Sequence, residues 1–221
     1  MDGEAVRRPG PFPGADVGAG TAPGAAAPVW YAAYGSNMDP DRLACYLAGG
    51  RPEGAVRGFP GCRDRRPPVR TVPLLLPGRL YFALESRVWT GGMGFYDPLD
   101  PGEMPACAYL LTAGQFCDVA AQEMHRPPGA DLDLGEVLAT GRARFGPGRY
   151  ETLVCPGGLD GYPVLTFTAP WRSAEAALNA PSAAYLGRLA AGLAAVHGWD
   201  AARIAAYLDS RPGARPDGSD G

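Results

Sequence analysis

The sequence contains no lysine: all 20 of its positively charged side chains are arginines. This absence excludes a lysine Schiff base, a pyridoxal phosphate attachment site and a P-loop lysine. Histidine is almost as scarce, with only His125 and His197, and the five cysteines form no Cys-x-x-Cys pair. Such a composition argues against a metal centre. We therefore expect a protein that uses neither a metal ion nor another cofactor.

Charge and hydropathy exclude further classes. The net charge of −3 provides no basic surface for nucleic acid. The sequence has no apolar run long enough to span a membrane and no apolar leader segment. We expect a cytoplasmic protein with reduced cysteines that binds neither nucleic acid nor membranes. The sequence leaves the oligomeric state open.

Composition also divides the chain into three parts. Residues 1–27 are mainly Gly, Ala and Pro, and 211–221 are similar, so both segments are predicted to be disordered. The remaining residues, 28–210, are predicted to form one domain. Within it, the Arg- and Pro-rich stretch 53–77 has no assigned role and could form a substrate loop.

The apolar patterning predicts an α+β fold, with a mixed sheet or small open β-barrel flanked by helices. One helix is predicted to begin after Asp39, one to run from Thr112 until Pro127, one to span 181–198 and a short one to follow Asp200. Strands are predicted at 29–33, 78–86, 89–98, 104–112, 136–145, 149–155 and 162–168.

The first predicted strand runs directly into Tyr34-Gly35-Ser36-Asn37-Met38, and a helix start follows at once. A turn of this kind directs several backbone N–H groups at one place, which suits an anion. Two alternatives concern the side chains: Asn37 could fix the shape of the turn, and Tyr34 could pack beneath it.

The usual nucleophile patterns are missing. No Gly-x-Ser-x-Gly motif surrounds Ser36, and Cys117 and His125 lie eight residues apart on one helical segment. Their separation along the axis, about 12 Å, is too long for a hydrogen bond. Glu123, near the end of that helix, is then the candidate catalytic group. Its spacing alone would also suit a solvated surface residue, and His125 would suit a structural role.

Four sequence motifs, taken together, resemble the γ-glutamyl cyclotransferase family. They are YGSNM (34–38), VWTGGMGFYDP (88–98), LTAGQFCDVAAQE (111–123) and NAPSAAYLGRLAAGL (179–193), in the family's order. The resemblance covers about residues 29–208. It implies the cyclotransferase fold and places the family's proton-shuttling glutamate at Glu123. It implies substrate binding by Tyr34, Gly35, Ser36, Asn37, Met38 and Tyr185.

The family's reaction needs no nucleophile from the enzyme. The α-amine of a γ-glutamyl amide attacks its own γ-carbonyl and releases 5-oxoproline and a free amine. The resemblance therefore implies a cofactor-free enzyme of the acyltransferase or lyase type. It could remove a γ-glutamyl protecting group from a biosynthetic intermediate, as some relatives do. The family usually has Gly after the glutamate, whereas Met124-His125-Arg126 follows here.

Two other classes stay open on the sequence. An enzyme of the same fold could transfer the glutamyl group to a different amine, and a non-catalytic module could bind a small molecule in the same pocket. The amine that leaves, the pathway and any part played by His125 are not given by the sequence.

Overall fold

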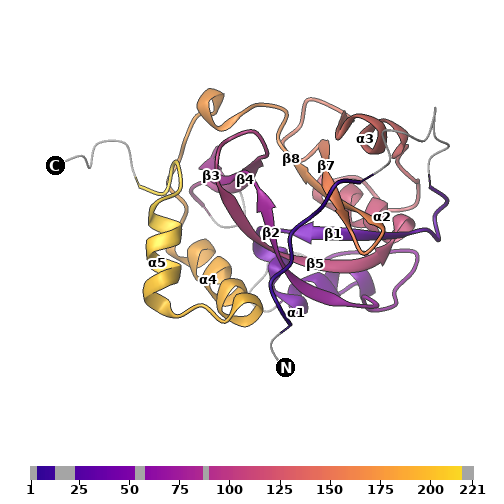
Figure 1. Cartoon of the computed structure of the whole chain (residues 1–221), viewed down its shortest axis with the longest axis horizontal. Helices are drawn as coiled ribbons and strands as arrows, with labels where there is room; N and C mark the ends of the chain where they lie inside the picture. The colour runs from indigo at the N-terminus through magenta and orange to yellow at the C-terminus, as the bar shows by residue number, and fades with distance from the viewer. Residues whose placement is uncertain (1–3, 13–22, 53–57, 87–89, 216–221) are drawn as a thin grey trace.

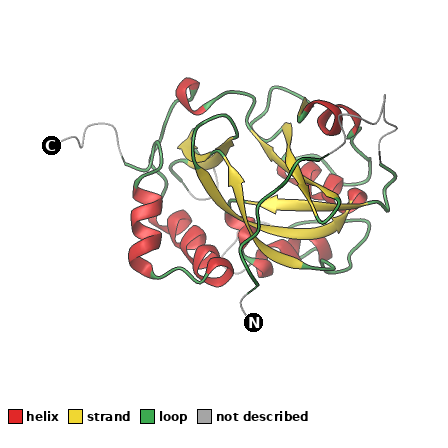
Figure 2. Cartoon of the chain, viewed as in Figure 1, coloured by secondary structure: helices red, strands yellow, loops and turns green. Residues whose placement is uncertain are grey.

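The computed structural model describes residues 4–12, 23–52, 58–86 and 90–215. Two sheets form: a six-stranded sheet of order β2-β5-β1-β8-β7-β6 and a two-stranded sheet of β3 and β4 (Figures 1 and 2). The six-stranded sheet is mixed, because β1 pairs antiparallel with β5 and parallel with β8. The predicted α+β class is confirmed.

The elements follow the chain in this order. The strands are β1 (Pro28–Ala33), β2 (Thr71–Pro77), β3 (Arg79–Ala83), β4 (Met93–Asp97), β5 (Glu103–Thr112), β6 (Arg142–Arg144), β7 (Thr152–Leu159) and β8 (Tyr162–Thr168). The helices are α1 (Pro40–Ala48), α2 (Ala113–Glu123), α3 (Gly135–Thr140), α4 (Ala183–His197) and α5 (Ala201–Asp209), with 3-10 turns η2 (Ser36–Met38) and η3 (Ser173–Glu175).

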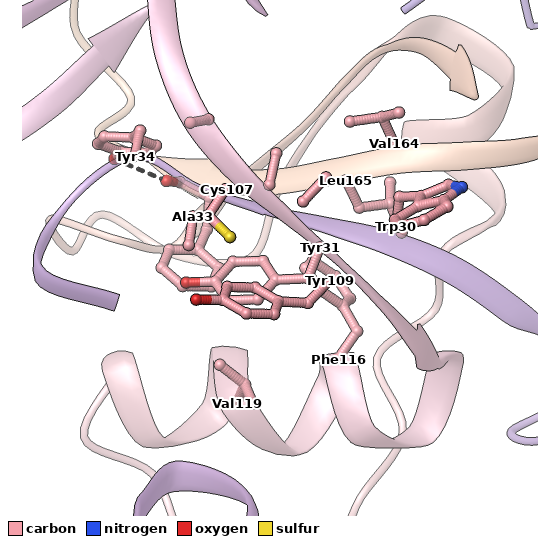
Figure 3. Packing of buried hydrophobic residues seen from close by; sticks show 14 of the residues in the cluster. Trp30, Tyr31, Ala33, Tyr34, Cys107, Tyr109, Phe116, Val119, Val164 and Leu165 are labelled. Atoms are coloured by element: carbon pink, nitrogen blue, oxygen red, sulfur yellow. Dashed lines mark hydrogen bonds between the residues drawn. The ribbon is translucent and has the colours of Figure 1, made fainter. Parts of the chain in front are cut away.

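Strand β1 lies at the centre of the sheet and is buried on both faces from Val29 onward. A near-continuous apolar run is what such a position requires. Tyr31 faces α2, where its ring lies 6.0 Å from that of Phe116 between centroids (Figure 3). Trp30 has its indole N–H satisfied by the carbonyl of Leu159, at 2.9 Å.

Helix α2 returns along β1. The antiparallel register sets Thr112, the last residue of β5, opposite Pro28, the first residue of β1. Thr112 then caps α2, in a capping box with Gln115. Eleven helical residues advance about 16 Å, close to the length of β1. The last residue of α2, Glu123, therefore lies near the end of β1.

Helices α4 and α5 form as predicted. Ser182 caps the start of α4, and Gly198 ends it in the left-handed conformation, with φ 63°. A Cβ atom on Gly192 would lie 2.8 Å from the Cβ of Met38, so glycine allows α4 to approach η2 closely. Asp200 caps α5.

The predicted strand at 136–145 is wrong. Helix α3 occupies its first half, and only the three residues of β6 are extended. Leu134, Val137 and Leu138 follow a helical spacing, and Gly141 closes the helix with φ 81°. Strand β2 was not predicted: it occupies the end of the stretch 53–77, for which a substrate loop was considered. Among the predicted elements, β3 and β4 are shorter than expected, and α2 ends at Glu123, before Pro127. Of the predicted strand at 89–98, Trp89 lies outside the described residues.

The prediction that 1–27 is disordered is wrong for residues 4–12, which we call the N-terminal strap. Arg7 pairs with Leu74 of β2, and Gly10 pairs with Gly158 of β7. Four backbone hydrogen bonds of 2.9 Å make these two pairings. In Figure 1 the strap, in indigo, crosses in front of the sheet. Ion pairs and backbone pairing with strands of the sheet hold this segment in place. Amino-acid composition, on which the prediction of disorder rested, contains no information about such contacts.

Other parts of the predicted disordered ends also contact the domain. The carbonyl groups of Ala25 and Ala27 accept hydrogen bonds from the first turn of α2. At the other end, the backbone N–H of Phe82 donates to the carbonyl of Pro212, at 2.8 Å. The rest of the predicted disorder, 1–3, 13–22 and 216–221, lies outside the described residues.

Candidate active site

The turn after β1 leaves the sheet where the parallel strands β1 and β8 both end. Asp39 caps α1 through a hydrogen bond from the backbone N–H of Asp41. Tyr109, from β5, contacts the backbone of the turn. Its hydroxyl donates to the carbonyl of Met38 at 2.9 Å and lies 3.2 Å from that of Asn37. Strand, cap and tyrosine together fix the backbone of η2.

Glu123 contacts this turn through the side chain of Asn37. The Asn37 amide nitrogen lies 2.9 Å from Oε1 of Glu123 and 3.2 Å from the hydroxyl of Tyr31. Asn37 is buried, whereas Glu123 is partly exposed. The structure thus brings together two of the predicted site residues, one buried and one partly exposed.

The charge of Glu123 acts on three tyrosines, Tyr31, Tyr46 and Tyr185. Burial raises the pKa of Tyr31 and Tyr46, and the negative charge of Glu123 raises them further. Burial also raises the pKa of Tyr185, to about 12, with a smaller contribution from Glu123. All three phenols therefore stay protonated at neutral pH and can donate hydrogen bonds. Glu123 is the group of this cluster suited to accept a proton.

Tyr185 lies between the turn and β4. Its hydroxyl accepts a hydrogen bond of 3.2 Å from the backbone N–H of Gly94. A Cβ atom would lie 2.9 Å from this hydroxyl at Gly94 and 3.4 Å from it at Gly35. Glycine at both places makes room for the phenol beside the turn.

The other predicted residues of the turn differ in exposure. Tyr34 is buried; its hydroxyl donates to the carbonyl of Phe167 at 2.9 Å (dashed line at Tyr34 in Figure 3). Met38 is buried beneath Gly192. Gly35 and Ser36 are partly exposed. Tyr34 and Met38 are placed to support the turn, and Gly35 and Ser36 lie on its accessible side.

Cys117 and His125 are not brought together. The sulfur of Cys117 is buried against the backbone of Leu132, and burial raises the pKa of this thiol to about 11. His125 is exposed and lies one residue beyond the C-cap of α2, with φ 58°. A thiolate–histidine pair does not form.

Asp118, on α2, has a structural role. Its buried carboxylate accepts hydrogen bonds from the backbone N–H groups of Arg63 at 2.9 Å and Gly129 at 3.1 Å. It also pairs with the Arg63 guanidinium, 3.0 Å away. Part of the Arg- and Pro-rich stretch is thereby anchored on α2. Residues 53–57 of that stretch lie outside the described part of the chain.

Three residues that support Asn37, namely Arg42, Tyr46 and Phe59, were not predicted from the sequence. The Nε of Arg42 donates to Oδ1 of Asn37 at 3.2 Å. The Arg42 guanidinium lies 5.8 Å from the ring centroid of Tyr46 and 5.5 Å from that of Phe59. These two rings stack with centroids 3.8 Å apart. No sequence signal marks an arginine on the first turns of a helix as part of a site.

Within 4–12, 23–52, 58–86 and 90–215, no three His, Cys, Asp or Glu side chains gather as a metal site would need. Over the same residues, no helix has the length and apolar character to cross a membrane.

No family model matches the chain. A curated relative, histone deacetylase 5 of Arabidopsis thaliana, is 33% identical over an alignment of 201 residues that covers 82% of this chain. The chain spans 30% of the length of that relative, so the relative's name describes a much larger protein.

Two solved structures resemble this chain in the arrangement of their helices and strands. An uncharacterized protein from Homo sapiens has a TM-score of 0.46 and 16% identity, over 86% of this chain and 91% of that one. A gamma-glutamyl cyclotransferase has a TM-score of 0.45 and 14% identity, over 84% and 89% of the two chains. Likeness this distant does not establish an activity, which must be argued from the site itself.

Proposed function

We propose that the protein is a cofactor-free enzyme that cyclises γ-glutamyl amides, releasing 5-oxoproline and a free amine. The observation that carries the proposal is the contact between Asn37 and Glu123, at 2.9 Å. It unites the YGSN turn with the glutamate that the motifs single out, although the two lie on different elements. Tyr185, from the fourth motif, lies beside the same turn.

The reaction would begin with Glu123 as a base. It accepts a proton from the α-amine of the substrate, whose nitrogen attacks the γ-carbonyl carbon. The bond from the γ-carbon to the leaving nitrogen then breaks, and Glu123 returns the proton to that nitrogen. Attack within one molecule gains an effective molarity of about 10⁵–10⁸ M when the substrate is held folded. Orientation would therefore supply much of the acceleration.

The surrounding groups would stabilise the negative charge that develops on the carbonyl oxygen. The hydroxyl of Tyr185 is protonated and can donate. The N–H groups of Ser36 and Asn37 begin η2 and have no acceptor within that turn. In this proposal Gly35, Ser36 and Asn37 contact the substrate, and Tyr34 and Met38 hold the turn in shape. We expect the enzyme to work in the cytoplasm.

The deciding experiment incubates the full chain with a panel of γ-glutamyl amides and identifies the products by mass spectrometry. We expect 5-oxoproline and one free amine in equal amounts. Peptides of the same composition with an α-glutamyl link are the control, because they do not carry the γ-amide that the reaction consumes.

The same assay distinguishes the rival functions. Free glutamate as the product would mean hydrolysis, and a new glutamyl amide would mean transfer to another amine. Saturable binding of γ-glutamyl amides without any product would mean a binding module. Each of these results would overturn the cyclisation proposal.

A further inference from the structure

Glu123 ends a helix, which is an unfavourable place for a carboxylate. The carbonyl groups at the C-terminus of α2 carry partial negative charge, so an ionised Glu123 needs compensating donors. The Asn37 amide supplies one, at 2.9 Å. Whether it can do so depends on which way this amide points.

An asparagine amide has an oxygen that accepts and a nitrogen that donates, and its neighbours decide between the two orientations. The Tyr31 hydroxyl, 3.2 Å away, can donate or accept and so does not decide. Arg42 can only donate, and its Nε lies 3.2 Å from Oδ1 of Asn37. Arg42 therefore fixes the oxygen toward itself and the nitrogen toward Glu123.

Arg42 is itself held in place. Its guanidinium lies against the stacked rings of Tyr46 and Phe59, and its side chain is partly buried. Cation–π contacts of this kind are attractive and restrict the movement of the guanidinium. The donor that orients Asn37 is thus part of a packed unit.

We propose that Arg42 is a positioning residue that acts through Asn37 to keep Glu123 ready to accept a proton. Without Arg42, the amide can rotate and present its oxygen to Glu123. That oxygen can hydrogen-bond only to a protonated carboxyl group, so rotation favours the form that cannot act as a base. The catalytic consequence rests on the proposed function, whereas the orientation of Asn37 does not.

The orientation can be tested without any activity. Arg42→Met keeps an unbranched chain as far as the position of Nε and removes the donor, and Arg42→Gln places an amide nitrogen where Nε was. Asn37→Ala identifies the side-chain amide signals of Asn37 by NMR. We expect hydrogen exchange of this amide to be about tenfold faster in Arg42→Met than in the wild type, and less changed in Arg42→Gln. Unchanged exchange in Arg42→Met, with the backbone spectrum intact, would overturn the proposal.

The route through Asn37 is tested by the pH dependence of 5-oxoproline release. Arg42→Met should move the acidic limb of the pH–rate profile to higher pH. The double variant Asn37→Ala/Arg42→Met should match Asn37→Ala alone. Shifts that add would show that Arg42 acts by its charge and not through Asn37, which contradicts the proposal. If the wild type releases no 5-oxoproline, the proposed function fails, and the exchange experiment still decides the role of Arg42.

Discussion

The side-chain amide of Asn37 donates to the carboxylate of Glu123 across 86 positions of sequence. Strand register produces this contact. Because Pro28 lies opposite Thr112, a helix that starts at Thr112 and runs back for 11 residues ends beside the turn that follows β1. The site is therefore assembled by the central strand pair and the helix that covers it.

Replacing Glu123 by Gln should abolish most of the activity without unfolding the protein. Glutamine keeps the size of the side chain and can still accept the hydrogen bond from Asn37, but it cannot take the proton of the amine. We expect the rate of 5-oxoproline release to fall about 10²–10⁴-fold. Circular dichroism and the melting temperature should stay close to those of the wild type.

Ser36→Ala is the matched control for the turn. If the turn acts mainly through backbone N–H groups, loss of the Ser36 hydroxyl should reduce the rate far less than Glu123→Gln does. A fully active Glu123→Gln variant would place the proton transfer elsewhere, with His125 as the next candidate.

His125→Gly should stabilise the protein and leave the activity unchanged. His125 lies just beyond the C-cap of α2 with φ 58°, a conformation in which a side chain costs about 1–2 kcal/mol. Glycine removes this strain but loses more entropy on folding, so the net gain should be about 0.5–1 kcal/mol. Urea unfolding measures the gain.

The control is His125→Ala, which removes the imidazole and keeps the strain, and should bring no such gain. A folded His125→Gly variant that no longer releases 5-oxoproline would instead make His125 part of the chemistry.

Local patterns predicted most of the elements, because caps and apolar spacing act over a few residues. Gly198 and Asp200 marked helix ends correctly. The failure at 136–145 arose where a short apolar stretch suits a strand or a helix equally well. For the candidate site, sequence located Asn37 and Glu123, but it gave no sign of Arg42, Tyr46 or Phe59. Arg42 and Tyr46 are neighbours on α1, but their contacts with Asn37 and Phe59 depend on how α1 packs against the turn before it and the loop after it, which apolar spacing and caps do not encode.

Removing the N-terminal strap should destabilise the domain. Deletion of residues 1–12 removes the four backbone hydrogen bonds made by Arg7 and Gly10, together with the ion pair of Arg7 with Asp160. It also exposes the edge of β2. After the entropy regained by the freed segment, we expect a loss of about 1–3 kcal/mol, or about 2–4 °C in melting temperature for each kcal/mol.

Deletion of residues 1–3 is the control, because it leaves the strap and its contacts in the chain. If the two deletions melt at the same temperature, the strap contributes nothing to stability, which contradicts this prediction.

The stability of the fold should fall in mild acid because of His197. This residue ends α4, and its Nε2 lies 3.1 Å from the carbonyl of Ala106 in β5. Its Nδ1 is buried without a hydrogen-bond partner. Burial lowers the pKa of His197 below its usual 6.5, and the positive charge of Arg203 lowers it further, although the hydrogen bond to Ala106 opposes both. The helix end would favour the charged form, but burial dominates.

The sign of the effect follows from that lowered pKa. At pH values between the folded and the unfolded pKa, the unfolded chain binds a proton at His197 that the folded chain does not. The contribution to stability is therefore complete above the usual histidine pKa and is lost as the pH falls through the folded one. His197→Gln keeps a donor for the Ala106 carbonyl but does not titrate. Urea unfolding from about pH 7.5 to about pH 5 should show a steeper loss of stability in the wild type than in His197→Gln. Because the carboxylates titrate in both proteins, parallel curves would show that His197 is not the group responsible.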